Sequence, residues 1–158
     1  MAITSADTID ARVVGVADGD TITVLDSKQK QYTIRFAGID APERNQPVGA
    51  RSIQNLARYV AGKDVRLDCH KTDRYQREVC KVWVQPADCS RCGKMLDVGL
   101  SQVTDRMAWW FRRYADEQSA EDRGRYDSAE QEATLRKRGL WADDNPVPPW
   151  EFRRRGGK

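Results

Sequence analysis

The stretch IDARVVGVADGDTITVLDSKQKQYTIRFAGI, residues 9–39, decides the fold. It is rich in β-branched residues, its apolar and polar positions largely alternate, and turn-forming residues interrupt it at 18–19 and 26–28. Alternation with a period of two is typical of strands that bury one face. The stretch therefore predicts three strands in a meander.

Two further strands and a helix extend this meander. Apolar residues recur at helical spacing between Pro47, which we expect at the first helical position, and Gly62. The segments DVRLDCH (64–70) and REVCKVWVQ (77–85) predict two strands around a turn at 72–76. Five strands with a helix between the third and the fourth is the order of an OB-fold, a five-stranded Greek-key barrel.

Two more helices are expected after the barrel. MLDVGLSQV, residues 95–103, is a short amphipathic candidate, and a longer helix is expected at 120–138, capped by Ser119 and ended by Gly139. The expected fold class is therefore α+β, mainly β, with about three helices.

Length and charge set the domain organisation. A chain of 158 residues fits one domain, which we place at 8–142, followed by a Pro-rich and basic tail at 143–158. The net charge of +3 arises within residues 151–158, so it indicates no partner, and we interpret the ending RRRGGK as a solvated terminus. No stretch approaches the ~20 apolar residues of a membrane span, so no membrane partner is expected.

The four cysteines are Cys69, Cys80, Cys89 and Cys92. The first two lie symmetrically about the expected hairpin and would face each other at bridging distance. The other two form CSRC, which could be a disulfide loop, half of a zinc site or a redox pair. We favour two disulfides, since no second C-x-x-C completes a zinc site, and leave zinc and free thiols as alternatives.

Disulfides would indicate an oxidising compartment, so we expect a secreted or periplasmic protein rather than a cytoplasmic one. MAITSADTID, residues 1–10, lacks the apolar core of a signal peptide. We therefore interpret Met1 as the start of a chain from which a leader was removed.

Three polar clusters fall where loops are expected: DGDT at 18–21, RFAGIDAPER at 35–44 and DRYQR at 73–77. Taken singly, each has a purely structural explanation, because turns and hairpin tips favour such residues. The second cluster holds two acids on either side of a rigid proline, and their repulsion requires a cation or an arginine nearby. In combination, the clusters predict a site.

The residue types in these clusters suit phosphoryl transfer. Asp20 and Asp40 could supply oxygen ligands to a hard cation such as Ca²⁺, together with a backbone carbonyl and waters. Glu43 beside such a metal could take a proton from water as a general base. Arg35 and Arg77 could bind phosphate oxygens in bidentate fashion.

From about Thr8 to Trp141 the chain resembles the staphylococcal nuclease family. The resemblance lies in an ordered set of motifs: DGDT at 18–21, R-x4-D-x-P-E at 35–43, D-x-Y-x-R at 73–77 and GLW at 139–141. It implies an OB barrel with three helices. It also implies endonuclease activity that depends on one Ca²⁺ ion, hydrolyses DNA and RNA with low sequence specificity and leaves 3′-phosphates.

The roles that the resemblance implies are as follows: metal ligands Asp20, Asp40 and the carbonyl of Ala41; catalytic residues Arg35, Glu43 and Arg77; nucleotide contacts Tyr75 and Tyr114. Thr21 is expected to orient Asp20, while Asp18 is assigned to the turn. The chain departs from the family pattern at Ala41, where a threonine is common, and at Gln76, where a glycine is common.

The cysteines and the run AWWFRRY at 108–114 are foreign to the staphylococcal enzyme itself. One or more of Trp109, Trp110, Phe111 and Tyr114 could stack on a base. For any single one of them, packing in the core is the favoured interpretation.

The expected partners are DNA and RNA, with single strands preferred, and the expected state is a monomer. A second hypothesis is a non-catalytic OB module that binds nucleic acid or protein, although such domains typically lose the acids and arginines that this chain keeps. A third is a zinc or redox protein built on CSRC.

Overall fold

The computed structural model describes residues 8–157. Its strands are β1 (Thr8–Asp18), β2 (Thr21–Leu25), β3 (Gln31–Phe36), β4 (Ile39–Asp40), β5 (Asp64–Thr72), β6 (Glu78–Val84), β7 (Leu96–Asp97) and β8 (Trp109–Trp110). Its α-helices are α1 (Gly49–Val60), α2 (Val98–Thr104), α3 (Ala120–Thr134) and α4 (Pro149–Arg154), with 3₁₀ turns η1 (Arg112–Glu117) and η2 (Gly139–Ala142).

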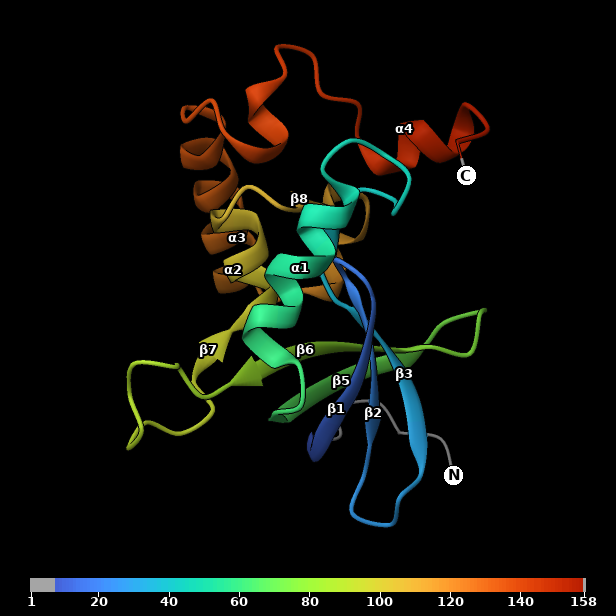
Figure 1. The fold of residues 1–158 in the computed structure, drawn as a ribbon, viewed down its shortest axis with the longest axis vertical. Coiled ribbons are helices and arrows are strands. Elements are labelled where there is room, and N and C mark those ends of the chain that lie inside the picture. Colours follow the sequence, from blue (N-terminus) through green and yellow to red (C-terminus); the bar gives the residue numbers. More distant parts are fainter. Residues whose placement is uncertain (1–7, 158) are drawn as a thin grey trace.

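The meander and the barrel are confirmed. The main sheet has the order β3-β2-β1-β5-β6-β7, and β3 pairs also with β6, which closes β1, β2, β3, β5 and β6 into a barrel (Figure 1). Alternate residues of the strands, such as Ile22, Val24 and Ile34, are fully buried inside it. The fold is therefore the expected α+β, mainly β architecture.

Closure of the barrel brings two distant segments side by side. β3 and β6 are parallel, with Arg35 opposite Val79. The end of β3 therefore lies beside the start of β6, next to the hairpin that carries Arg77. β3 also pairs with β2 in antiparallel fashion, and there Arg35 lies opposite Thr21, the residue after Asp20. All three polar clusters thus meet at one end of the barrel.

The start of α1 differs from the prediction. Pro47 precedes the helix, which begins at Gly49 after Val48 in a left-handed conformation (φ 72°). The reason is a turn in which the N–H of Gly49 donates to the carbonyl of Gln46. A side chain on Gly49 would collide with the carbonyl oxygen of Glu43, so the loop that carries Glu43 packs directly on the helix start.

The helices after the barrel are shorter than predicted. Asp97 caps α2 by accepting from the N–H of Leu100, so residues 96–97 form a short strand instead of helix. Ser119 caps α3 as expected, but α3 ends at Thr134 and not at 138. Its last buried residue is Ala133, and the four residues after Thr134 are exposed, so further turns would bury nothing. Gly139, with φ 59°, opens η2 instead.

The solvated terminus predicted for RRRGGK, residues 153–158, is wrong at Arg153, which pairs with the buried Asp40. Residues 149–154 form α4, which lies beside the loop before α1 (Figure 1). Its Pro149 is buried, and the side chain of Gln46 donates to the carbonyl of Val147 at 2.6 Å. Arg154 and Arg155 do stay exposed, so the prediction holds only for the last residues. None of the helices within residues 8–157 is long and apolar enough to cross a membrane.

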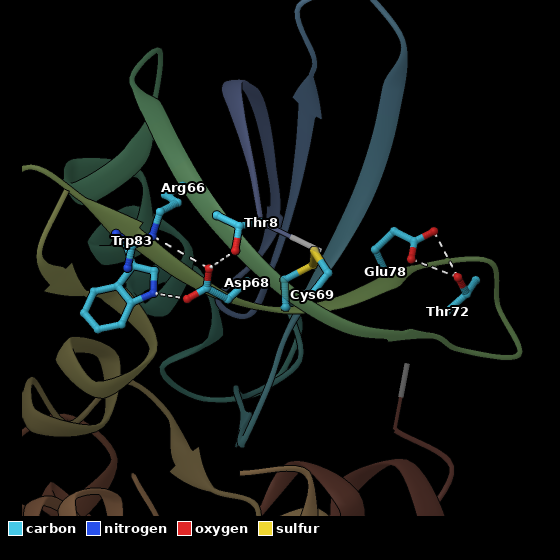
Figure 2. The surroundings of a disulfide bond; sticks show 8 residues. Thr8, Arg66, Asp68, Cys69, Thr72, Glu78 and Trp83 are labelled. Atoms are coloured by element: carbon cyan, nitrogen blue, oxygen red, sulfur yellow. Dashed lines mark hydrogen bonds and ion pairs between the residues drawn. A yellow bond between two sulfur atoms is a disulfide. The ribbon is translucent and has the colours of Figure 1, made fainter. Parts of the chain in front are cut away.

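Both predicted disulfides are present. Cys69 of β5 and Cys80 of β6 are paired positions in the sheet and are bonded to each other (Figure 2). Cys89 and Cys92 close the small CSRC loop. All four cysteines lie in the described part of the chain and none is free, so this pairing leaves no thiolate to bind zinc.

The Cys69–Cys80 disulfide should contribute most to stability. It is buried, and it closes the hairpin at whose tip Arg77 lies. We expect the double variant Cys69→Ala/Cys80→Ala to lose about 2–4 kcal/mol of unfolding free energy. Removal of Cys89 and Cys92 should cost less, since their loop is short and solvent-exposed. Chemical denaturation of both double variants checks this, and equal losses would contradict it.

Candidate active site

The three polar clusters line one pocket of about 820 Å³ at the end of the barrel. Its acids are Asp18, Asp20, Asp40, Glu43, Asp73 and Glu117, and its bases are Arg35, Lys71, Arg74, Arg77, Arg113 and Arg153. Phe36, Phe111, Tyr75, Tyr114 and Trp150 supply aromatic surface. The sequence-predicted residues are thus brought together, and an unpredicted one, Arg153, joins them.

Arg35 links two buried carboxylates. Its guanidinium group lies 3.2 Å from Asp20 Oδ2 and 3.4 Å from Asp40 Oδ1, and all three side chains are at least mostly buried. One cation therefore neutralises two acids, one from the turn before β2 and one from β4, which is the arrangement that their repulsion requires.

Asp20 is held rigidly. Its Oδ2 accepts from the backbone N–H of Ala41 at 2.7 Å, and its Oδ1 accepts from the hydroxyl of Thr21 at 2.9 Å. The turn before it is anchored by the buried side chain of Gln102, which donates to the carbonyl of Gly19 at 2.8 Å. Hydrogen bonds from Thr21 and Ala41 thus hold the carboxylate of Asp20, and Gln102 of α2 holds the turn before it.

Two of the crowded carboxylates have raised pKa values. Burial, with the charge of Asp20 adding to it, raises the pKa of Asp40 to about 6 despite the opposing effect of Arg153 and Arg35. The pKa of Asp18 is also raised, first by burial and then by the charges of Asp20 and Glu43. Asp18 therefore does more than shape the turn, because it is one of the six acids that line the pocket.

Glu43 lies on the loop between β4 and α1. Its backbone N–H donates to the side-chain oxygen of Gln46 at 3.0 Å, and its carbonyl accepts from the N–H of Gln46. Its own side chain is 29% exposed, so it can reach solvent in the pocket. A partly exposed carboxylate on a fixed loop is suited to accept a proton from water.

Arg77 is positioned by Asp73 of the same hairpin. Asp73 accepts from Arg77 Nε at 2.8 Å and from the backbone N–H groups of Tyr75 and Arg77. Although burial opposes it, this bonding lowers the pKa of Asp73. Gln76 adopts φ 64° in the turn, the left-handed region that explains why glycine is common there in the family.

The aromatic candidates separate into two groups. Trp110 is buried and donates from Nε1 to Gln118 at 2.8 Å, so the core interpretation holds for it. Trp109 packs edge-on against Trp141 and Trp150.

The exposed aromatic residues lie in the pocket itself. Tyr75 and Tyr114, the two predicted nucleotide contacts, are 65% and 43% exposed. Phe111 also lines the pocket and stacks on Trp150. Basic side chains accompany both tyrosines: Arg74 and Arg77 lie near the ring of Tyr75, and Lys71 lies near that of Tyr114.

Arg153 was missed because the tail was interpreted as solvated. It forms ion pairs with Asp40 at 2.7 Å and with Glu43 at 2.6 Å. A signal was available in the sequence: Pro149 can begin a helix, and Trp150 and Arg153 then lie on one face of it. An aromatic residue in a charged tail needs an apolar surface to cover it.

The oxygen atoms present suit one hard divalent cation. Within residues 8–157, no group of three or more His, Cys, Asp or Glu side chains is arranged to hold a metal ion. Asp20 and Asp40, however, both pair with the guanidinium group of Arg35, one through Nη1 and the other through Nη2, so the two carboxylates share one positively charged partner. Two carboxylates with a backbone carbonyl and waters form the kind of ligand set that Ca²⁺ accepts.

Comparison with known proteins agrees with this geometry. The family described as staphylococcal nuclease homologue matches residues 33–143. The chain belongs to the staphylococcal nuclease family. Three relatives are also similar. ParB of Escherichia coli is 40% identical over 145 residues, which cover 90% of this chain and 77% of ParB.

The other two relatives carry nuclease names. A protein of Haemophilus influenzae described as an uncharacterized endonuclease is 36% identical over 143 residues, 90% of this chain and 72% of its own length. A micrococcal nuclease of Shigella flexneri is 34% identical over 142 residues, 90% of this chain and 79% of its own length. The similarity to staphylococcal nuclease family members therefore covers nearly the whole barrel and the helices after it.

Proposed function

We propose that the chain is a calcium-dependent endonuclease that hydrolyses phosphodiester bonds of DNA and RNA with low sequence specificity. One observation carries the proposal: the five motif residues Asp20, Arg35, Asp40, Glu43 and Arg77 converge in a single pocket. Family membership and the nuclease names of relatives support hydrolysis of nucleic acid as the activity.

The two arginines would bind the phosphate. Arg35 reaches the pocket from β3, and Arg77 reaches it from the hairpin between β5 and β6. Their guanidinium groups would hold non-bridging oxygens and stabilise the charge that grows as phosphorus becomes five-coordinate. Glu43 would take the proton from the attacking water. As the new P–O bond forms, the P–O5′ bond breaks and O5′ takes up a proton, which leaves a 3′-phosphate.

The acids would hold the metal. Asp20, Asp40 and the carbonyl of Ala41 are the proposed ligands of one Ca²⁺ ion, and the hydroxyl of Thr21 keeps Asp20 in place. When bound, such an ion supplies positive charge that stabilises the transferring phosphate. The chain's contribution is a fixed set of oxygens at the pocket floor.

The rim would select unpaired bases. Tyr75 and Tyr114 present exposed rings beside basic side chains. Base stacking on such rings is worth about 1–3 kcal/mol per base and requires a base free of its duplex partner. We therefore propose a preference for single strands. All five motif residues come from one chain, so the proposed activity requires no second copy, and we propose a monomer.

The disulfides support a location outside the reducing cytoplasm. Two disulfides form within residues 8–157, and disulfides persist in oxidising compartments. We propose a secreted or periplasmic protein.

A metal and substrate assay tests the function. Single-stranded DNA, duplex plasmid and RNA are incubated with the purified protein in Ca²⁺, in Mg²⁺ and in excess chelator. We expect cleavage in Ca²⁺, fastest for single strands, and its loss in chelator. An Asp40→Asn variant controls for contaminating nucleases. Undiminished cleavage in chelator would remove calcium from the proposal, and binding without cleavage would establish the alternative of a non-catalytic module.

A further inference from the structure

Arg153 occupies both oxygens of a proposed metal ligand. Its Nη2 lies 2.7 Å from Asp40 Oδ2, and its Nη1 lies 3.3 Å from Asp40 Oδ1 and 2.6 Å from Glu43 Oε1. Asp40 is 1% exposed, whereas Arg153 is 44% exposed and approaches it from the pocket side. The guanidinium group therefore covers the face of Asp40 that solvent and ligands would reach.

The position of Arg153 is fixed by α4. Trp150, three residues earlier on the helix, stacks on Phe111 with ring centroids 5.3 Å apart and contacts Trp109 edge-on. Gln46 ties the segment before α4 to the loop of Glu43, because it bonds both Val147 and the backbone of Glu43. Two contacts that precede Arg153 in the chain, at Val147 and Trp150, thus hold the tail against the rest of the domain.

The ion pairs of Arg153 affect how a cation can bind Asp40. Arg35 compensates Asp20 and part of Asp40, but Oδ2 of Asp40 and the carboxylate of Glu43 are paired with Arg153. A divalent cation that binds Asp40 must compete with this guanidinium group for the same oxygen. A contact that exists only in the metal-free protein weakens metal binding by its own free energy.

We propose that Arg153 is a positioning residue of the active site that pairs with Asp40 and Glu43 in the metal-free protein and leaves Asp40 when a divalent cation binds. The C-terminal helix thereby sets the metal affinity of the site. The inference rests on the proposed calcium site, and it adds a residue from outside the motifs that define the family resemblance.

Calcium titration of the protein without nucleic acid tests the proposal. In Arg153→Ala, isothermal titration calorimetry should give a Ca²⁺ dissociation constant about tenfold lower than in the natural protein, since one charged hydrogen-bonded pair no longer competes. Arg155→Ala is the matched control: it changes the same residue type directly after α4, but Arg155 is 63% exposed and pairs with Glu151. The control should bind Ca²⁺ as the natural protein does.

Thermal unfolding supplies a second readout. Without metal, Arg153→Ala should unfold at a lower temperature because Asp40 and Glu43 lose their partner, and Ca²⁺ should raise its midpoint by more than it raises that of the natural protein. Arg153→Lys, which keeps the charge but not the two-pronged contact, should lie between the two. Trp150→Ala, which frees α4, should shift affinity in the same direction as Arg153→Ala.

The outcomes separate this inference from the function. Unchanged or weaker Ca²⁺ binding in Arg153→Ala, with nuclease activity intact in the natural protein, overturns the role of Arg153 and leaves the nuclease proposal standing. Failure of both proteins to bind Ca²⁺ overturns the calcium site, and the inference with it. Tighter binding in Arg153→Ala but not in Arg155→Ala supports it.

Discussion

Arg35→Ala should lower kcat/KM on single-stranded DNA and RNA by about 10²- to 10⁴-fold. Arg35 is the only arginine on β3, and its guanidinium group lies between Asp20 and Asp40 at the floor of the pocket. A phosphate bound there would lose the donor that meets its growing negative charge. Arg35→Lys should recover little, because an ammonium group cannot make the planar two-pronged contact.

The loss must be separated from damage to the fold. Breaking a buried pair commonly costs about 3–5 kcal/mol, and Asp20 and Asp40 both lose a partner in Arg35→Ala. Activity is therefore measured well below the thermal midpoint of the variant. Arg12→Ala is the control, since Arg12 also lies on a barrel strand but pairs with Asp64 at the exposed surface. Full activity in folded Arg35→Ala protein would refute the phosphate-binding role.

The barrel could be predicted from sequence because its signal is local. Alternation within residues 9–39 reflects burial on one face of each strand, and the turn residues between the strands mark where pairing begins. The closing pair of β3 and β6 has no such signal, since it joins residues more than forty positions apart in parallel. No local sequence pattern therefore indicates that β3 and β6 pair.

Helix ends were less predictable because burial decides them. A capping serine was sufficient to locate the start of α3. Its end depended on where the chain runs out of apolar surface, and the charged run 136–138 gives no sign of that boundary. Pro47 likewise suited a helix start, but the turn at Gln46 places the first helical residue at Gly49.

The site residues that belong to sequence motifs could be predicted. The residue that reaches the site through tertiary packing, Arg153, could not. Asp20, Arg35 and Asp40 come together because the turn before β2 meets the ends of β3 and β4. Arg153 reaches Asp40 from α4, whose Trp150 stacks on Phe111, a contact between residues that are close in space and distant in sequence. A charged tail looks solvated until the apolar surface beneath it is known.

Glu43→Gln should lower kcat by about 10²- to 10⁴-fold with little change in KM. Glutamine keeps the shape of the side chain and one of its two acceptor oxygens but cannot accept a proton from water. Glu43 also makes no contact with Arg35 or Arg77 among the ion pairs of residues 8–157, so phosphate binding should persist. A loss confined to kcat therefore identifies a role in the chemical step.

A loss of activity in Glu43→Gln can be assigned to the chemical step because the variant should keep its fold. The Glu43 side chain is partly exposed, and the loop around it is held by backbone contacts to Gln46 that glutamine leaves in place. Glu132→Gln, an exposed glutamate on α3 paired with Arg136, removes the same charge far from the pocket and should keep full activity. Thermal unfolding confirms that both variants are folded. If kcat of Glu43→Gln equals that of Glu132→Gln, the proton leaves the attacking water by another route and Glu43 is not the base.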